Sequence, residues 1–196
     1  MKWTGLTGGI ATGKSTAKKL IESLGFPVID ADQISHQLTD VGQLGYERIL
    51  SHFGQTIINA DQTLNRQLLG RMIFSDEKQK NALEAILHPL IREQVLHEKE
   101  LHRKSGAKIC FYDVPLLFEK KLWNDFDATV LIWCDEETQL ERLMKRNQLS
   151  EAEARLRMAN QLSMIEKVKL ADYCVDNSTT VEELEKQLQR LIKKFG

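Results

Sequence analysis

Short apolar runs alternate with longer amphipathic stretches along most of the chain. Two of the runs, Ile109–Val114 and Ala128–Cys134, are almost uninterrupted, which is typical of parallel strands that are covered on both faces. Three further strands are predicted at Lys2–Leu6, Pro27–Asp30 and Tyr173–Val175, the first of them weak because polar and glycine residues dilute it. The alternation indicates an α/β fold, in which a five-stranded parallel sheet with right-handed crossovers carries helices on both faces.

The stretch from about residue 31 to residue 104, between the second and third predicted strands, has helical periodicity almost throughout. Its apolar stripes comprise Ile49, Leu50 and Phe53, then Leu68, Leu69, Met72, Ile73 and Phe74, and finally Leu83, Ile86 and Leu87. Pro89 follows the last stripe, and we expect that the same helix cannot continue through it undisturbed, because proline lacks the N–H that the helix needs. The block is too long for a simple crossover and predicts an inserted, helical substrate-binding region.

Composition narrows the class of protein. The chain has 196 residues, 42% of them hydrophobic and 28% charged, with a net charge of −1. This balance argues against a protein that generally binds nucleic acid or membrane surfaces. No apolar run has transmembrane length. We also expect no signal peptide. The three cysteines, Cys110, Cys134 and Cys174, lie in strand-like segments without metal-ligand spacing, and we expect reduced, buried thiols in a cytosolic protein.

The segment Gly8–Thr16 satisfies the phosphate-binding pattern G-x-x-x-x-G-K-[ST]. Its glycines permit a tight turn whose N–H groups cradle phosphate oxygens. Lys14 can reach the β- and γ-phosphates, and the hydroxyl of Ser15 can hold Mg²⁺. An amphipathic run follows from Ser15 to Leu24, so the positive end of a helix dipole points at the same anion. The pattern therefore predicts a nucleoside triphosphate site.

Asp30 and Asp32 stand at the carboxyl end of the second predicted strand, the edge that faces the ligand in open α/β sheets. Phosphoryl transfer to an alcohol benefits from a carboxylate that orients the hydroxyl and accepts its proton. The alternative is ordinary N-capping of the next helix by either aspartate. Beside a phosphate loop we favour a catalytic role for one of them, with the other positioning it or a Mg²⁺-bound water.

A second strand-end segment runs from Asp113 to Glu119. The carboxylate of Asp113 stands where it could place a Mg²⁺-bound water, a question that the sequence leaves open. Glu119 is a candidate for contact with a substrate. The apolar residues between them, from Leu116 to Phe118, are either core or, in the interpretation we favour, a wall of the substrate site.

Arginines cluster after the fourth predicted strand. Arg142 and Arg146 are one helical turn apart, so they project from one face and could clamp phosphate oxygens. The polar segment 147–161 that follows carries Arg155 and Arg157 and has the composition of a mobile lid. A solvated helix face is the plainer alternative.

His88 precedes Pro89, and Arg92 follows one turn after His88. We expect His88 to cap or fix the junction of two helices and Arg92 to face an anionic substrate. The other histidines have no spacing typical of a metal or catalytic site.

Five segments, in this order, resemble those of the dephospho-coenzyme A kinases; they are Thr7–Thr16, Val28–Asp32, His88-Pro89, Val114–Glu119 and Asp176-Asn177. The similarity extends over nearly the whole chain, from residue 4 to about residue 195. It implies the P-loop kinase fold, a cytoplasmic protein, and ATP-dependent phosphorylation of the ribose 3′-hydroxyl of dephospho-coenzyme A, with Mg²⁺ as the metal. The first strand is more polar than is usual in the family, a difference that touches no catalytic position.

The resemblance also implies roles for single residues. Asp32 corresponds to the carboxylate usually regarded as the base, and Asp30 to its companion. Arg142 and Arg146 correspond to basic residues that meet ATP, and Asn177 lies where relatives approach the adenine. Contact with the ATP phosphates is implied for Gly8, Ala11, Thr12, Gly13, Lys14, Ser15 and Thr16. Contact with the acceptor is expected of Asp32, His88, Arg92, Leu116 and Glu119.

We expect a single kinase domain over residues 1–196. Its parts are a core at 1–30, 105–145 and 171–196, a substrate-binding region at about 31–104 that would hold coenzyme A, and a lid at about 146–161. Either Arg155 or Arg157 could be the lid arginine.

Two other functions remain to be weighed. A nucleoside or nucleoside-monophosphate kinase shares the phosphate loop, sheet and lid, but the carboxylate pair and the helical insertion argue against it. A GTP-dependent switch protein would need a guanine-selective N-K-x-D segment, and the sequence has none. Oligomeric state is not written in the sequence.

Overall fold

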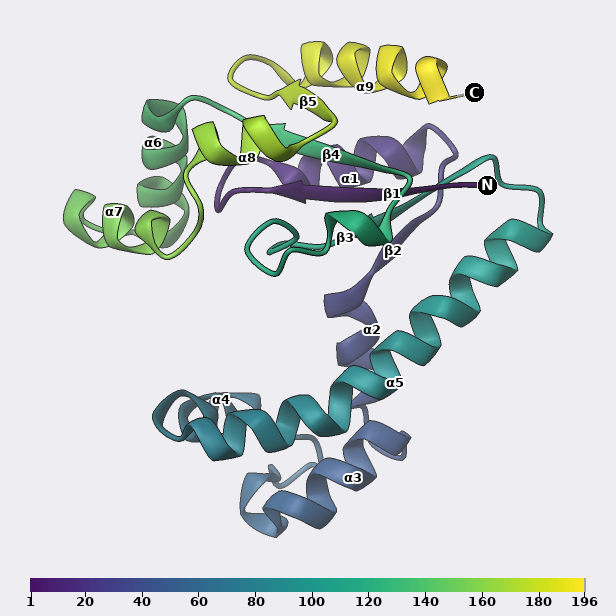
Figure 1. The fold of residues 1–196 in the computed structure, drawn as a ribbon. Coiled ribbons are helices and arrows are strands. Elements are labelled where there is room, and N and C mark those ends of the chain that lie inside the picture. Colours follow the sequence, from purple (N-terminus) through teal and green to yellow (C-terminus); the bar gives the residue numbers. More distant parts are fainter. Residues whose placement is uncertain (196) are drawn as a thin grey trace. The chain divides into compact units, whose positions relative to one another are not determined.

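One parallel sheet organises the protein, and its strands lie in the order β2-β3-β1-β4-β5 (Figure 1). In this computed structural model, which describes residues 1–195, the strands are β1 (Lys2–Gly8), β2 (Val28–Asp30), β3 (Ile109–Asp113), β4 (Ala128–Trp133) and β5 (Tyr173–Asp176). The central strand β1 pairs in parallel with β3 and β4, so that Leu6 lies opposite both Asp113 and Val130. The predicted five-stranded parallel sheet is confirmed.

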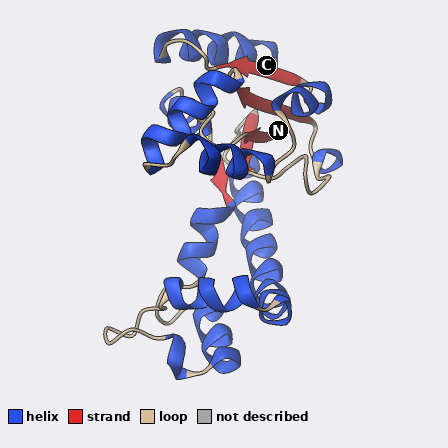
Figure 2. Ribbon diagram, turned by 90° about the vertical axis from the view of Figure 1, so that its left-hand side faces the viewer, coloured by secondary structure: helices blue, strands red, loops and turns tan. Residues whose placement is uncertain are grey.

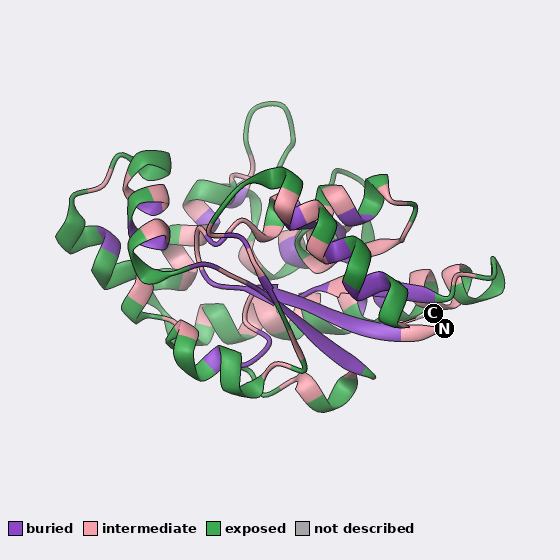
Figure 3. Cartoon of the chain, turned by 90° about the horizontal axis from the view of Figure 1, so that it is seen from above, coloured by how far each residue is buried: buried purple, intermediate pink, exposed green. Residues whose placement is uncertain are grey.

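Helices cover both faces of this sheet. On one face, α1 (Lys14–Ser23) and α9 (Val181–Phe195) pack their apolar stripes against strand residues such as Leu6 and Val130. On the other face, Leu117, Phe118 and Leu131 form a second cluster with Met164, the first residue of α8 (Met164–Leu170). Strands β1, β3 and β4 are buried along most of their length (Figure 3), which explains the near-continuous apolar sequences of β3 and β4.

A short helix, η2 (Trp123–Asp125), precedes β4. The helices α6 (Glu136–Asn147) and α7 (Glu151–Ala159) follow that strand. Leu140 and Leu143 of α6 pack against Ala154 of α7 in a small apolar cluster.

The chain divides into two compact units, one comprising residues 1–29 and 101–196 and the other residues 30–100. The second unit is mainly helical (Figure 2) and contains α2 (Ala31–Leu38), α3 (Leu44–Phe53), η1 (Gln55–Ile57), α4 (Arg66–Ser75) and most of α5 (Glu77–Lys104). It has its own core, in which Tyr46, Ile49 and Leu69 are buried. Each unit therefore buries a separate set of apolar side chains.

The expected junction of two helices at His88 is wrong, and Pro89 does not end the helix. Both residues lie inside the single helix α5, which runs from Glu77 to Lys104. A proline removes one hydrogen bond and tends to bend a helix, but a long helix can continue through it. Figure 1 shows α5 changing direction part-way along its length.

Two expectations about burial also need correction. Cys110 and Cys134 are buried, but Cys174 is exposed because it lies on β5, an edge strand of the sheet. None of these three cysteines forms a disulfide. In the helical unit, Phe74 is 95% exposed and does not join the apolar stripe of α4. Among the helices of residues 1–195, none is both long and apolar enough to cross a membrane.

Candidate active site

The phosphate loop joins β1 to α1 and has the backbone geometry of an anion cradle. Ala11 and Gly13 both have positive φ, 62° and 90°, and the hydroxyl of Thr12 donates to the carbonyl oxygen of Gly9 at 3.0 Å. Helix α1 begins at Lys14, and no side chain caps its N-terminus within the part of the chain described. Its first N–H groups are therefore left to face an anion.

Gly13 is required for two reasons. Its φ of 90° is a conformation that side chains disfavour, and a Cβ there would lie 2.0 Å from Nδ2 of Asn177. That amide donates to the carbonyl oxygen of Thr12 at 2.8 Å, so the loop turns directly against the Asn177 side chain.

Lys14 forms an ion pair with Asp113, the last residue of β3. The side chains are 17% and 7% exposed, respectively, so both charges are largely shielded from water. The pairing follows from the sheet, because β3 is the direct neighbour of the strand that carries the phosphate loop. Ser15, in the first turn of α1, is exposed.

Arg142 and Asn177 extend this network. Asn177 is buried, its backbone N–H donates to Trp133, and its carbonyl oxygen accepts a 2.7 Å hydrogen bond from Nη1 of Arg142. Arg142 thus supports the residue that supports the loop. Arg146, one turn later, is exposed, and its Nε donates only to Oδ1 of Asn147 among the described residues.

The segment predicted as a lid forms a turn and the helix α7. Ser150 and Glu153 make a capping box, in which hydrogen bonds from the Ser150 hydroxyl and N–H lower the pKa of the Glu153 carboxyl. Arg155 is paired with Glu151 and Glu136 at 2.8 and 3.2 Å. Arg157 has no such ion pair within residues 1–195, so of the two guanidinium groups it is the more available to bind a phosphate.

The two aspartates of the helical unit have different environments. Oδ1 of Asp30 accepts hydrogen bonds from the N–H groups of Asp32 and Gln33, at 2.8 and 3.0 Å, and so caps α2. Asp32 lies in the first turn of α2, and its carboxylate is exposed. The capping alternative therefore holds for Asp30, and it leaves the carboxylate of Asp32 available.

The segment after β3 is more structural than expected. Leu117 and Phe118 are 0% and 2% exposed and belong to the core, so their interpretation as a substrate wall is wrong. Leu116 is half-buried. Oε1 of Glu119 accepts a hydrogen bond from the N–H of Leu162 at 3.1 Å and forms a 2.8 Å ion pair with Lys167.

His88 and Arg92, the remaining predicted substrate contacts, are both exposed on α5. They are one helical turn apart and therefore lie on the same side of the helix.

Sequence reasoning missed two buried polar side chains. Gln139 donates to the carbonyl oxygen of Ile10 in the phosphate loop, and Lys167 is paired with Glu119. Gln139 is 4% exposed, and Lys167 is completely buried. The sequence around Lys167 does not predict this, because Glu166 and Lys169 are close to it in a short helix and a lysine there usually extends to solvent. A glutamine in the polar first turns of α6 is equally unremarkable.

Comparison with known proteins agrees with this geometry. The family model described as Dephospho-CoA kinase matches residues 2–183. A dephospho-CoA kinase of Listeria innocua is 40% identical over 194 residues, which cover 99% of this chain and 97% of that protein.

Solved structures agree as well. A crystal structure from Thermus thermophilus superposes with a TM-score of 0.82 at 31% identity, covering 100% of this chain and 98% of the other. A structure named as a dephospho-CoA kinase, from Campylobacter jejuni, has a TM-score of 0.68 at 28% identity, with 100% and 97% covered. The chain belongs to the dephospho-CoA kinase family.

Proposed function

We propose that this protein transfers the γ-phosphoryl group of ATP to the ribose 3′-hydroxyl of dephospho-coenzyme A, giving coenzyme A and ADP in the last step of coenzyme A synthesis. The observation that carries the proposal is the phosphate loop, with its two positive-φ residues and the uncapped N-terminus of α1, in a chain that matches one kinase family almost end to end. Membership of that family supports a cytoplasmic enzyme with two small-molecule substrates.

The phosphate loop binds the β- and γ-phosphates in this proposal. Backbone N–H groups of the segment 11–16, among them those of Ala11, Gly13 and Lys14, surround the oxygens, and Gly8 begins the turn. The ammonium of Lys14 exchanges its pairing with Asp113 for the phosphates, where charge builds up during transfer. Asn177 acts beside the loop, close to where the adenine is expected.

Asp32 accepts the proton of the 3′-hydroxyl and aligns that oxygen for attack. An exposed carboxylate in the first turn of α2 suits this role, since an acceptor can reach it. Asp30 acts as its companion by fixing the first turn of α2 through two backbone hydrogen bonds.

Arg142 and Arg146 offset negative charge on the phosphates. Arg142 is half-buried and anchored to Asn177, whereas Arg146 is exposed and free to move with the lid, about residues 146–161. His88, Arg92, Leu116 and Glu119 contact dephospho-coenzyme A, with the helical region at 31–104 providing most of its binding surface.

The donor set fits a Mg²⁺ ion that arrives with ATP. The described residues contain no group of three or more His, Cys, Asp or Glu side chains that could hold a metal alone. Mg²⁺ commonly takes one or two protein oxygens together with waters and substrate phosphates. Here the hydroxyl of Ser15 would be a direct ligand and Asp113 would hold a coordinated water; when bound, the ion neutralises phosphate charge.

Acceptor competition tests the proposal. Purified protein with ATP should phosphorylate dephospho-coenzyme A, and NMR of the product should place the new phosphate on the ribose 3′-oxygen. Nucleosides and nucleoside monophosphates serve as rival acceptors, and GTP as a rival donor. Faster turnover of a nucleoside or nucleoside monophosphate would overturn the proposal in favour of that kinase class.

A further inference from the structure

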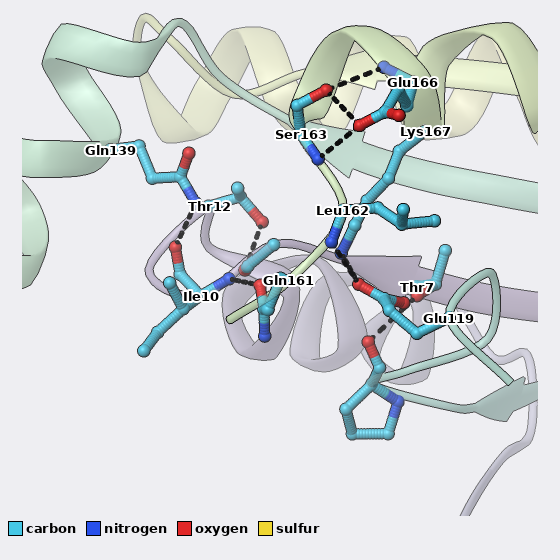
Figure 4. Close-up of polar contacts among 12 residues, drawn as sticks. Thr7, Ile10, Thr12, Glu119, Gln139, Gln161, Leu162, Ser163, Glu166 and Lys167 are labelled. Carbon is cyan, nitrogen blue, oxygen red and sulfur yellow. Dashed lines mark hydrogen bonds and ion pairs between the residues drawn. The ribbon is translucent and has the colours of Figure 1, made fainter. Parts of the chain in front are cut away.

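Two glutamines hold the peptide groups on either side of Ile10, at the tip of the phosphate loop (Figure 4). Oε1 of Gln161 accepts a hydrogen bond from the Ile10 N–H at 2.8 Å, and Nε2 of Gln139 donates to the Ile10 carbonyl oxygen at 2.7 Å. These glutamines are 151 and 129 positions away in the sequence, so the contacts are built by the fold and not by the loop motif.

Each contact fixes the direction of a neighbouring polar group. In a trans peptide the C=O and N–H point in opposite directions. When Gln139 draws the carbonyl of Ile10 toward itself, the N–H of Ala11 is turned the other way. When Gln161 draws the N–H of Ile10, the carbonyl of Gly9 is turned inward, where it accepts from the backbone and hydroxyl of Thr12 at 3.3 and 3.0 Å.

The next residue makes this support necessary. Ala11 has a φ of 62°, a conformation that costs free energy for any residue with a Cβ and persists only where the surroundings enforce it. The side chains of Ile10 and Ala11 also pack against the apolar cluster that joins α6 and α7. Both the peptide groups and the side chains at the tip are thus held from outside the loop.

Gly9, the residue before Ile10, leaves the space through which the amide of Gln139 reaches the loop. A Cβ on Gly9 would lie 2.8 Å from Nε2 of Gln139 and 2.8 Å from the sulfur of Met164. Only a residue without a side chain leaves room for an amide this close to the loop.

Gln161 is itself anchored. The N–H of the next residue, Leu162, donates to Glu119, and the carboxylate of Glu119 is paired with the fully buried Lys167 (Figure 4). Removing one partner of such a pair would leave an uncompensated buried charge, so the anchor resists displacement. Residue 161 therefore has a fixed position at the C-terminal end of the predicted lid.

We propose that Gln139 and Gln161 are positioning residues, which hold the phosphate loop in its phosphate-binding conformation before ATP arrives. The inference rests on the proposed function only in that ATP is the ligand of the loop. Without Gln139, the loop samples conformations in which the Ala11 N–H is turned away; without Gln161, it samples conformations in which the Gly9 carbonyl no longer accepts from Thr12. Because the apparent dissociation constant rises as the competent fraction falls, the loss should appear in ATP affinity and not in the chemical step.

The test compares Gln161→Met, which keeps the length of the side chain but has no comparable acceptor, with Gln189→Met at an exposed position on α9. Gln139→Met is a second, independent variant. Gln139 and Gln161 both line a pocket of about 670 Å³ between α6, α7 and α8, so a slightly altered side chain has room.

We expect Gln161→Met and Gln139→Met each to raise the Kd and KM for ATP about tenfold, equivalent to 1.4 kcal/mol. The KM for dephospho-coenzyme A and kcat should stay within about threefold of the parent. Calorimetric titration with a non-hydrolysable ATP analogue measures the Kd without any acceptor, so it stands even where the proposed acceptor is wrong. An unchanged Kd in both variants would overturn the proposal. So would a loss that appears in kcat or equally in both substrates, which would indicate general disruption.

Discussion

Lys14 exchanges one charged partner for another in the proposed ATP complex. In the free protein its ammonium is paired with Asp113 in a largely buried position. The pairing avoids an unpartnered buried charge. It also means that Asp113 competes with the phosphates for the ammonium of Lys14. The balance favours the phosphates in the transition state, because negative charge develops toward the β-phosphate as the bond to the transferred group breaks.

We expect Lys14→Ala to lower kcat by at least about a hundredfold while the fold is retained. Steady-state kinetics measure kcat, and circular dichroism checks that the fold is retained. Lys19→Ala, an exposed position on the same helix, is the matched control and should behave like the parent. Near-normal turnover of the Lys14 variant would remove this residue from the phosphate site.

The two aspartates before and within α2 allow a sharper comparison. Asp32→Asn keeps the shape of the side chain but cannot accept a proton, so we expect kcat to fall by about a hundredfold or more with nucleotide affinity nearly unchanged. Asp30→Asn keeps an oxygen that can cap α2, since asparagine and aspartate are equally good caps, and should cost much less. The reverse ranking in kcat would identify Asp30 as the base.

At the residue scale, the sequence predicted those parts of the site that a local motif specifies. Lys14 and Ser15 follow from one pattern of eight positions, because the loop binds phosphate mainly through its own backbone. Gln139, Gln161 and the Glu119–Lys167 pair could not be predicted, since their partners are brought together only by the folded sheet and the helices around it. Spacing along the chain has no information on such contacts.

At the scale of elements, the strands were predictable and the helical block was only partly so. Buried parallel strands have continuous apolar runs, and all five appear within two residues of their predicted bounds. Helix α5 shows the limit. Proline signals a helix end on local grounds, whereas packing on both sides of Pro89, through residues such as Leu87 and Leu90, stabilises the helix across it.

The predicted lid is the element whose closure a measurement of hydrogen exchange can test. Its helix α7 packs on α6 through Ala154, and its arginines are exposed. Transfer to an alcohol competes with transfer to water, so an open site would hydrolyse ATP. We expect hydrogen exchange across residues 147–161 to slow when a non-hydrolysable ATP analogue and dephospho-coenzyme A are both bound.

Arg146 provides the kinetic counterpart. Arg146→Ala should reduce kcat more than it weakens acceptor binding, because the contact strengthens as charge redistributes in the transition state. Lys145→Ala, the exposed neighbour, is the control for lost charge alone. Equal exchange in the free and bound states, together with unchanged kcat in the Arg146 variant, would leave a solvated helix in place of a lid.

At the scale of the whole molecule, the division into two units separates the proposed tasks. The sheet unit contains the phosphate loop and its supports, and the helical unit carries Asp32 and most of the expected acceptor surface. Each unit has its own apolar core, so each can respond to its own ligand. The shared helix α5 and the short β2 were visible in the sequence as elements, but their positions at the boundary between units were not.

The tryptophans make this division measurable. Trp3, Trp123 and Trp133 are the three tryptophans of the sequence, and all lie in the sheet unit, so their fluorescence during urea unfolding reports on that unit. A ligand that binds only the folded state stabilises it by about 2.7 kcal/mol at a concentration of 100 times its Kd. We therefore expect a saturating ATP analogue to move the fluorescence midpoint to higher urea in the parent and not in Lys14→Ala.

Hydrogen exchange of Ile49 and Leu50, in the core of the helical unit, should not change with the analogue, because that core is separate from the core beside the phosphate loop. An equal gain in protection there would show that the two units unfold as one, and the analogue would then stabilise the whole chain from the phosphate loop alone.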